Sequence, residues 1–327
     1  MMEQRKLGKS GLTASVIGLG CWQLGGDFGP TGVENSQQIL NAADSESITF
    51  WDTADVYGGG ESENKIGSWR QEHPKPRTIV TKLGRDGSLY PAQYTPDNML
   101  RSIEGSLARL QVNCIDLIQL HCIPPAVLQG DAVWQILEDC RTQGLIKHYG
   151  ASVENINEGL MCLDKPGLTS LQIIFNLFRQ DAIQQLLPQA AAADVGIIAR
   201  LPLASGLLSG KFALDTEFTE GDHRNYNKDG KFFNVGETFS GLPYAKAIEL
   251  INELKGLLPA DIPLAQLALR WIVDQPQITS VITGASSAEQ VKQNAKVADL
   301  PALSEELHNI LSEFYYAKVK AHVRGDI

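Results

Sequence analysis

Short runs of apolar, β-branched residues alternate with longer amphipathic segments along most of this chain. Consecutive apolar positions are typical of strands whose two faces are both buried, as in parallel sheets. The pattern predicts eight strands, over residues 15–20, 48–53, 78–83, 115–120, 147–152, 170–176, 195–200 and 280–284. Each of these strands is followed by sequence with the periodicity of a helix.

Several amphipathic segments carry helix signals at their ends. Residues 95–111 have apolar side chains at helical spacing, and Thr95 is the expected N-cap. A second helix is predicted over residues 131–144, where Gly144 ends it. Three further helices are expected over residues 244–257, 264–274 and 289–300.

Eight strands that alternate with helices are what a closed (β/α)8 barrel requires. The competing arrangement is an open doubly wound sheet, which commonly carries a GxGxxG turn after its first strand. The corresponding sequence here is GLGCWQLGG, in which the glycines are wrongly spaced and Trp22 would obstruct the turn. We therefore predict a TIM barrel that forms a single domain over residues 1–327.

Two segments extend the predicted barrel. Residues 5–15 are typical of a short β-hairpin that turns at residues 9–11 and could close the bottom of the barrel. Residues 201–279 are too long for a single crossover after the seventh strand. This insertion contains a polar, aromatic-dotted loop over residues 212–234, and a long loop on the catalytic face of a barrel is more often a binding lid than filler.

The composition excludes several classes of function. The 327 residues are 43% apolar with a formal net charge of −10, which argues against nucleic acid and anionic membranes as partners. No apolar run reaches the roughly 20 residues that span a bilayer, and the N-terminus does not resemble a secretory signal, so we expect a cytoplasmic protein. The five cysteines form no CxxC pair, which favours reduced thiols over a disulfide framework or a metal site.

Four chemically complementary side chains fall at the C-terminal ends of three successive predicted strands. Asp52 and Tyr57 lie in FWDTADVYGGGESE after the second strand, Lys82 closes the third, and His121 closes the fourth. The C-terminal ends of the strands form the catalytic face of a barrel. Neighbouring parallel strands lie about 4.8 Å apart, so the four side chains are expected to converge.

These four groups suit the reduction of a carbonyl. Tyr57 would donate the proton, and the charge of Lys82 would lower its pKa from the free value of about 10. Asp52 would hold Lys82 charged and in place, and neutral His121 would orient the carbonyl oxygen. Each residue alone is more simply an ion pair, a packed turn or a core histidine, but the set of four favours catalysis.

The motifs resemble those of the aldo-keto reductase family over nearly the whole chain. The matching segments are LGKSGLTASVIGLG, DTADVYGGGESE, IVTK, IDLIQLH, YGAS, PLASGLLSGK and GASSAEQVKQN. The resemblance implies a (β/α)8 barrel with an N-terminal hairpin that binds NADPH without a Rossmann domain. It also implies a catalytic tetrad, formed here by Asp52, Tyr57, Lys82 and His121.

The resemblance further implies which residues hold the cofactor. They are Ser152 and Gln172 for the nicotinamide carboxamide, Gly20, Cys21, Trp22 and Asp52 beside the nicotinamide ribose and substrate, Pro202, Leu203, Ser205 and Lys211 for the pyrophosphate, and Gly284, Ser286, Gln290 and Asn294 for the adenosine 2′-phosphate and adenine. A glycine-bearing turn that opens a helix supports the last group, because it offers free N–H groups and the positive end of the helix dipole. An ordinary N-cap at Ser286 or Ser287 is the alternative there.

Three positions depart from the family pattern. Val153 stands where many members have Asn, so one carboxamide contact is missing. Arg200 stands where an aromatic ring commonly stacks on the nicotinamide, and its charge would disfavour the oxidised cofactor and could bind an anionic substrate. Gly284 and Gln290 replace basic residues that some members place around the 2′-phosphate. Another branch of the family combines this neutral pattern with a loop arginine and NADPH, and the resemblance to it implies that Arg224 contacts this phosphate and that NADPH is preferred over NADH.

These observations predict an NADPH-dependent reductase of a small-molecule aldehyde or ketone. The alternatives are a dehydrogenase that oxidises a sugar or polyol, and a cofactor-sensing subunit resembling the channel-associated β-subunits of the family, which the intact tetrad disfavours. A phosphosugar isomerase is disfavoured by Tyr57 and Lys82 together. The substrate and the oligomeric state stay open. Residues that could line an apolar substrate pocket are Trp22, Trp51, Tyr90, Phe232 and Phe233.

Overall fold

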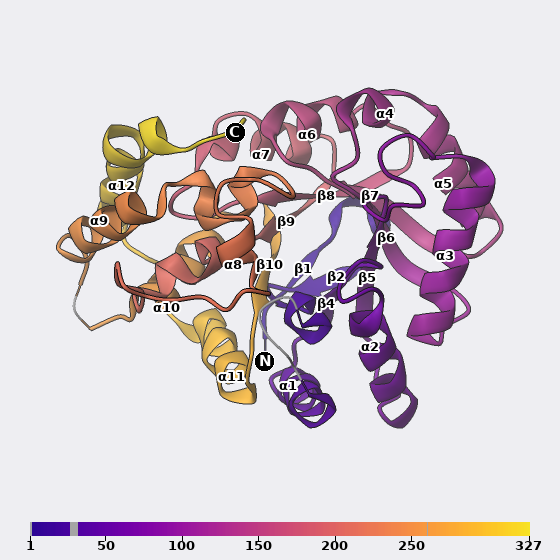
Figure 1. The fold of residues 1–327 in the computed structure, drawn as a ribbon, viewed down its shortest axis with the longest axis horizontal. Helices are drawn as coiled ribbons and strands as arrows, with labels where there is room; N and C mark the ends of the chain where they lie inside the picture. The colour runs from indigo at the N-terminus through magenta and orange to yellow at the C-terminus, as the bar shows by residue number, and fades with distance from the viewer. Residues whose placement is uncertain (1, 27–31, 260) are drawn as a thin grey trace.

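The computed structural model describes residues 2–26, 32–259 and 261–327. Eight parallel strands close into a barrel in the order β10-β3-β4-β5-β6-β7-β8-β9, and helices surround it (Figure 1). The barrel strands are β3 (Ile17–Gly20), β4 (Phe50–Asp52), β5 (Thr78–Leu83), β6 (Ile115–His121), β7 (Ile146–Ser152), β8 (Leu168–Ile174), β9 (Gly196–Arg200) and β10 (Ile278–Gly284). The predicted (β/α)8 barrel is confirmed.

The hydrogen-bond register brings the C-terminal ends of the strands to one face of the barrel. Gly20, which ends β3, pairs with Asp52, which ends β4. His121, which ends β6, pairs with Ser152, which ends β7. Side chains that the sequence places at strand ends therefore share one rim.

All eight predicted strands are present, although their bounds differ by a few residues. The second, predicted over 48–53, is reduced to the three residues of β4. The first was expected to include Ser15, but the backbone of Ser15 pairs with Gln4 in the N-terminal hairpin, and β3 begins at Ile17.

Helices follow the strands as the amphipathic segments predict. The Thr95 side chain accepts a hydrogen bond from the Asn98 amide at the start of α3, and α5 ends shortly before Gly144. Ser287, and not Ser286, is the N-cap of α11. The helices are α1 (Val33–Ser45), α2 (Glu61–Glu72), α3 (Pro96–Leu110), α4 (Pro125–Gln129), α5 (Ala132–Thr142), α6 (Ile156–Cys162), α7 (Leu186–Ala192), α8 (His223–Tyr226), α9 (Tyr244–Lys255), α10 (Leu264–Val273), α11 (Ala288–Ala295) and α12 (Glu305–Phe314). Within the described ranges, none of the helices has the length and apolar character needed to traverse a bilayer.

The predicted N-terminal hairpin is present as β1 (Gln4–Lys6) and β2 (Thr13–Ser15), which pair antiparallel. Leu7, in the turn between them, is fully buried in a cluster that includes Phe50 and Leu117 of the barrel strands. The Lys9 amide donates a hydrogen bond to the carbonyl oxygen of Asp194, just before β9 begins. The hairpin therefore covers the barrel at the N-terminal ends of its strands, away from the rim that carries the candidate site.

The predicted insertion after the seventh barrel strand lies between β9 and β10. Besides α8, α9 and α10 it contains the 3-10 turns η4 (Ala204–Ser209) and η5 (Val235–Glu237). Its aromatic rings reach the strand-end face, where the ring centroid of Trp22 lies 4.7 Å from that of His223 and 6.4 Å from that of Phe233. The insertion therefore folds over the face to which the strand ends point.

Candidate active site

Two neighbouring side chains at the end of β4 point in opposite directions, one into the core and the other into the site. Side chains alternate along a strand, and Trp51 packs outward on Trp69 of α2, with ring centroids 5.0 Å apart. Trp51 is fully buried there and does not line a substrate pocket, contrary to expectation. Asp52 points to the other side, where it accepts hydrogen bonds from Lys82 Nζ at 2.6 Å and Gln172 Nε2 at 2.7 Å.

Tyr57 is carried by the glycine-rich turn that follows β4. Gly58 in this turn has a positive φ, and a Cβ there would lie 2.2 Å from the Gly25 carbonyl oxygen, so only glycine allows the two loops to approach. The turn holds the Tyr57 hydroxyl 3.2 Å from Lys82 Nζ, which also donates to the carbonyl oxygen of Thr53 at 2.8 Å. The acid, the ammonium and the phenol are therefore in contact, as the sequence predicts.

Burial and mutual contacts set the charges of this group. Burial alone would lower the pKa of Lys82, but Asp52 and Tyr57 outweigh it and raise the pKa above its usual value, so Lys82 is an ammonium. Burial raises the pKa of Tyr57, although Lys82 lowers it. The expectation of a net lowered pKa for Tyr57 is therefore wrong: Lys82 acts in the predicted direction, but the desolvation of the phenolate is larger.

His121 completes the group from the end of β6. Its ring is perpendicular to that of Tyr57, with centroids 5.9 Å apart. Burial, followed by the charges of Arg85, Lys82 and Arg200, holds the pKa of His121 well below its usual value. The imidazole is therefore neutral at neutral pH, which is the state expected of a group that orients a carbonyl oxygen.

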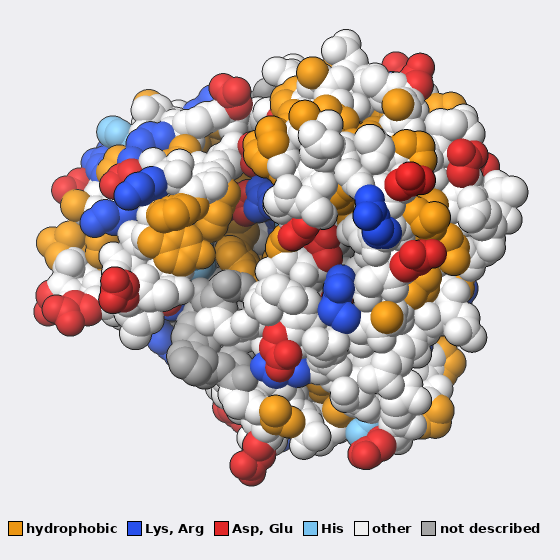
Figure 2. All heavy atoms as spheres, turned by 45° about the vertical axis from the view of Figure 1, so that its right-hand side comes forward, with side chains coloured by type: hydrophobic (Ala, Val, Ile, Leu, Met, Phe, Trp, Pro, Cys, Tyr) orange, Lys and Arg blue, Asp and Glu red, His pale blue; other side chains and the backbone are white. Residues whose placement is uncertain are grey.

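These groups open onto a cleft of about 1050 Å³ across the strand-end face. Figure 2 shows a hollow in the surface of the molecule with hydrophobic side chains gathered beside it. Most of the residues expected to hold a cofactor line the cleft, namely Gly20, Trp22, Asp52, Gln172, Arg200, Pro202, Leu203, Ser205, Lys211, Arg224, Gly284, Ser286, Gln290 and Asn294. Its aromatic lining includes the expected Trp22, Tyr90, Phe232 and Phe233.

Two of the expected cofactor residues do not line the cleft. The Cys21 side chain is fully buried in the hydrophobic core, and its amide donates to the Asp52 carbonyl oxygen at 2.8 Å. The Ser152 side chain is buried behind the wall, and its hydroxyl lies 3.5 Å from Gln172 Oε1. Ser152 therefore supports Gln172, whereas the Cys21 side chain points into the core.

Arg200 is placed beside the site but is not a free charge. Its guanidinium forms an ion pair with Glu237 of the insertion at 3.3 Å and donates to the Val153 carbonyl oxygen at 3.2 Å. Glu237 and its other partner, Arg85, carry no sequence motif and were not among the expected site residues. The expectation that Arg200 repels the oxidised cofactor or attracts an anion therefore changes, because a carboxylate neutralises it.

The expected anion-binding residues lie at the far end of the cleft. Arg224 forms an ion pair with Asp222, and one of its terminal nitrogens lies 3.6 Å from the position that a Cβ on Gly206 would occupy. Gly206 lies in η4 and directly follows Ser205, the last of the residues 202–205 that the sequence assigns to the pyrophosphate. Arg224 therefore lies near the expected pyrophosphate residues.

One residue at this end was missed by the sequence. The helix predicted over residues 289–300 is divided, because α11 ends at Ala295 and a 3-10 turn follows over Lys296–Asp299. Lys296 lines the cleft together with Gln290 and Asn294. Lys296 follows Gln293, which also lines the cleft, by three residues, and positions three apart share one face of a helix. The predicted helix could therefore have indicated it.

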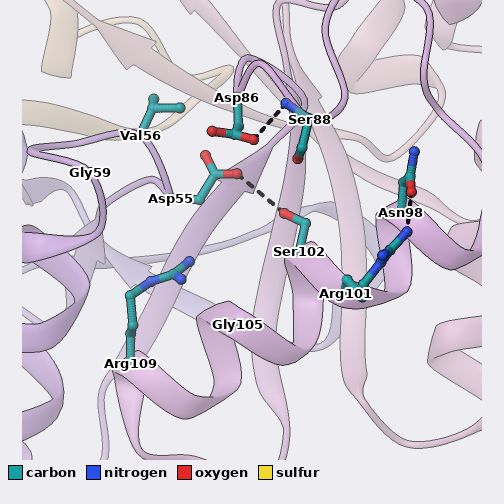
Figure 3. Close-up of a pocket in the computed structure, with 10 residues that line it drawn as sticks. All are labelled: Asp55, Val56, Gly59, Asp86, Ser88, Asn98, Arg101, Ser102, Gly105 and Arg109. Atoms are coloured by element: carbon teal, nitrogen blue, oxygen red, sulfur yellow. Dashed lines mark hydrogen bonds between the residues drawn. The ribbon is translucent and has the colours of Figure 1, made fainter.

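A smaller cavity of about 560 Å³ lies behind the Tyr57 turn (Figure 3). Asp55 is buried beside it and accepts a hydrogen bond from the Ser102 hydroxyl at 3.3 Å. Burial, followed by the charge of Glu63, raises the pKa of Asp55 to about 7. This carboxyl group lies two residues before Tyr57 in the sequence.

Comparison with known proteins agrees with the fold. Residues 16–315 match the Aldo/keto reductase family, and the chain therefore belongs to this family of oxidoreductases. The resemblance inferred from the motifs is thereby confirmed.

Individual relatives extend over nearly the whole chain. The uncharacterized oxidoreductase YqkF of Bacillus subtilis is 31% identical over 313 residues, which cover 93% of this chain and 94% of the relative. The holo form of aldo-keto reductase AKR11C1 from Bacillus halodurans is similar with a TM-score of 0.78 and 25% identity, covering 99% of this chain and 98% of that one. Glycerol dehydrogenase AKR11B4 from Gluconobacter oxydans has a TM-score of 0.78 and 26% identity, covering 97% and 96%.

Proposed function

We propose that this protein is an NADPH-dependent reductase of a small-molecule aldehyde or ketone, with Tyr57 as the proton donor. The observation that carries the proposal is the buried chain of contacts from Asp52 through Lys82 to the Tyr57 hydroxyl, which opens onto the cleft. A phenol held 3.2 Å from an ammonium is a proton donor whose product, the phenolate, is stabilised as it forms.

The residues of the cleft fit a dinucleotide cofactor. At the inner end the amide of Gln172, anchored by Asp52, suits the nicotinamide carboxamide. At the outer end Lys211, Arg224 and Lys296 line the same cleft and suit phosphate groups. Bound NADPH supplies a hydride.

The protein side chains would then carry out the proton transfer. Tyr57 gives its proton to the carbonyl oxygen, and Lys82 lowers the energy of the phenolate that remains. Asp52 keeps Lys82 charged and in place. His121, neutral and at the end of β6, donates a hydrogen bond that orients the carbonyl oxygen.

The test is an assay of aldehydes and ketones with NADPH and with NADH, in which turnover is measured by the absorbance of the reduced cofactor. Turnover that depends on Tyr57 and is faster or tighter with NADPH supports the proposal. A protein that binds neither cofactor, or reduces no carbonyl in a broad panel, would contradict it.

The oxidation of a polyol is the second candidate. The similarity to the glycerol dehydrogenase of Gluconobacter oxydans favours it, because the two chains align over nearly their whole lengths. The same tetrad serves both directions, with Tyr57 accepting a proton in oxidation. Assays with glycerol and sugar alcohols in the presence of the oxidised cofactor distinguish the two.

A further inference from the structure

A buried ionic network joins the insertion to the barrel beside the candidate active site. The Glu237 side chain, at the end of η5, is only 5% exposed. It accepts hydrogen bonds from both terminal nitrogens of Arg85, one of them at 3.2 Å, and forms an ion pair with Arg200 at 3.3 Å. Arg85 follows β5 and Arg200 ends β9, so one carboxylate of the insertion bridges two separate barrel strands.

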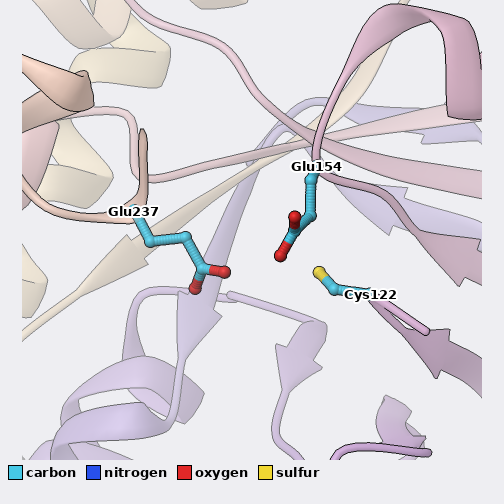
Figure 4. A group of neighbouring side chains, drawn as sticks. All are labelled: Cys122, Glu154 and Glu237. Carbon is cyan, nitrogen blue, oxygen red and sulfur yellow. The ribbon is translucent and has the colours of Figure 1, made fainter. Parts of the chain in front are cut away.

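The charges of this network balance. Arg85 also donates to Glu154 at 3.2 Å, so the two guanidinium groups face two carboxylates. In Figure 4 the carboxylates of Glu237 and Glu154 and the thiol of Cys122 point toward one another. Although burial raises its pKa, Arg85 and Arg200 hold the pKa of Glu237 at about 2. Glu237 is therefore ionised at any physiological pH, and its removal would leave one positive charge uncompensated.

Short contacts connect this network to the reacting groups. Arg200 Nη2 lies 3.5 Å from Cys122 Sγ, which lies 3.8 Å from the hydroxyl of Ser152. Ser152 contacts Gln172, whose amide is bonded to Asp52. The network therefore forms the wall of the cleft next to the tetrad.

The nicotinamide ring would be held by Gln172 and Asp52, which this wall adjoins. Hydride transfer needs the reacting carbon atoms about 3–3.5 Å apart, while the carbonyl oxygen stays within hydrogen-bond reach of the Tyr57 hydroxyl. The charges of Arg85 and Arg200 lower the pKa of His121, so they act on groups at the reacting end of the cleft. They would therefore act on the nicotinamide ring as well, which is neutral when reduced but positive when oxidised.

We propose that Glu237 is a positioning residue that, together with Glu154, neutralises Arg85 and Arg200 and thereby permits the oxidised cofactor to bind beside them. This inference rests on the proposed function. It concerns the charge of the nicotinamide ring alone, because the oxidised and reduced cofactors share the same phosphates. The Glu237 carbonyl oxygen also accepts a hydrogen bond from the Ser205 hydroxyl, in the expected pyrophosphate segment, at 3.0 Å.

The test measures dissociation constants of NADP⁺ and NADPH for Glu237→Gln by calorimetry or by fluorescence titration. One uncompensated unit charge several ångströms from the ring should raise the ratio of the NADP⁺ constant to the NADPH constant by about ten-fold. Glu237→Asp, which keeps the charge, should restore most of the wild-type ratio. The double variant Glu237→Gln with Arg200→Met should also return toward it, because Arg85 and Glu154 then balance.

Asp229→Asn is the matched control, because it removes an insertion carboxylate that pairs with Arg324, and neither residue lines the cleft. It should leave both constants and their ratio unaltered. Equal weakening of both cofactors by Glu237→Gln would overturn the inference and leave the proposed function standing. A wild-type protein that binds neither cofactor would overturn both. Retained NADPH binding shows that a variant is folded.

Discussion

Replacing Lys82 with Met separates the structural role of the buried ion pair from its role in catalysis. The Lys82 side chain is 1% exposed and that of Asp52 is 5% exposed, so the variant leaves a buried carboxylate without its counterion. Breaking a buried pair in this way costs about 3–5 kcal/mol of stability. The fold raises the pKa of Lys82, so the stabilisation that the Asp52–Lys82 ion pair gives to the folded state is complete below the pKa of a lysine in the unfolded chain. This stabilisation is lost as the pH rises through the pKa of Lys82 in the folded state.

The same variant should impair turnover through Tyr57. Among the charges that act on the phenol, Lys82 lowers its pKa and Asp52 raises it. In the variant only the raising effect of this pair remains, so the phenolate becomes harder to form. We expect kcat to fall by at least about 10²-fold. The limb of the pH–rate profile that reports Tyr57 should move to higher pH for both reduction and oxidation.

The assay pairs urea unfolding at neutral pH with pH–rate profiles for reduction and oxidation. The double variant Asp52→Asn with Lys82→Met is the control, because it removes both charges at once. It should recover most of the lost stability but none of the lost turnover. A single variant that is as stable as the wild type and has an unshifted profile would refute the reasoning.

Other predictions test the remaining groups. Tyr57→Phe should lower kcat by about 10²–10⁴-fold while NADPH binding persists, as measured by steady-state kinetics and titration. The folded state raises the pKa of Asp55 to about 7, so this group lowers the free energy of unfolding as the pH rises from its unfolded pKa of about 3.9 toward 7. Asp55→Asn should therefore raise the free energy of unfolding at pH 8 by up to about 4 kcal/mol and flatten its decline between about pH 4 and 7. Arg224→Ala should weaken NADPH and NADH by similar factors, because Arg224 lies beside η4 and the expected pyrophosphate residues. A loss for NADPH alone would instead assign Arg224 to the 2′-phosphate. Lys296→Ala should weaken NADPH by roughly ten-fold and NADH much less.

The sequence predicted the barrel because its signal is local and repeated. Each strand is a short apolar run, and each catalytic side chain follows such a run directly, so the parallel order of neighbours suffices to bring them together. Asp52, Tyr57, Lys82 and His121 needed no further information. The errors in the strands are of one or two residues, as at Ser15, where the chain turns from the hairpin into the barrel.

The ionic network could not be predicted in the same way. Glu237 lies 152 residues from Arg85, in an insertion whose path no periodicity determines. The sequence showed only that Arg200 replaced an aromatic residue and that its charge needed an explanation. The net direction of the Tyr57 pKa shift could not be predicted either. Burial raises this pKa and Lys82 lowers it, and the desolvation depends on packing that the strand pattern does not specify.

Charge is distributed unevenly along the cleft, and this resolves an apparent conflict with the composition. A chain with a net charge of −10 opposes a polyanionic ligand at long range. At the reacting end the ion pairs cancel, with Asp52 against Lys82 and Glu237 and Glu154 against Arg200 and Arg85. At the other end the cleft presents Lys211 and Lys296. The net charge therefore disfavours polyanionic partners that contact the whole surface. A dinucleotide, in contrast, would meet a neutral pocket for its ring and basic side chains for its phosphates.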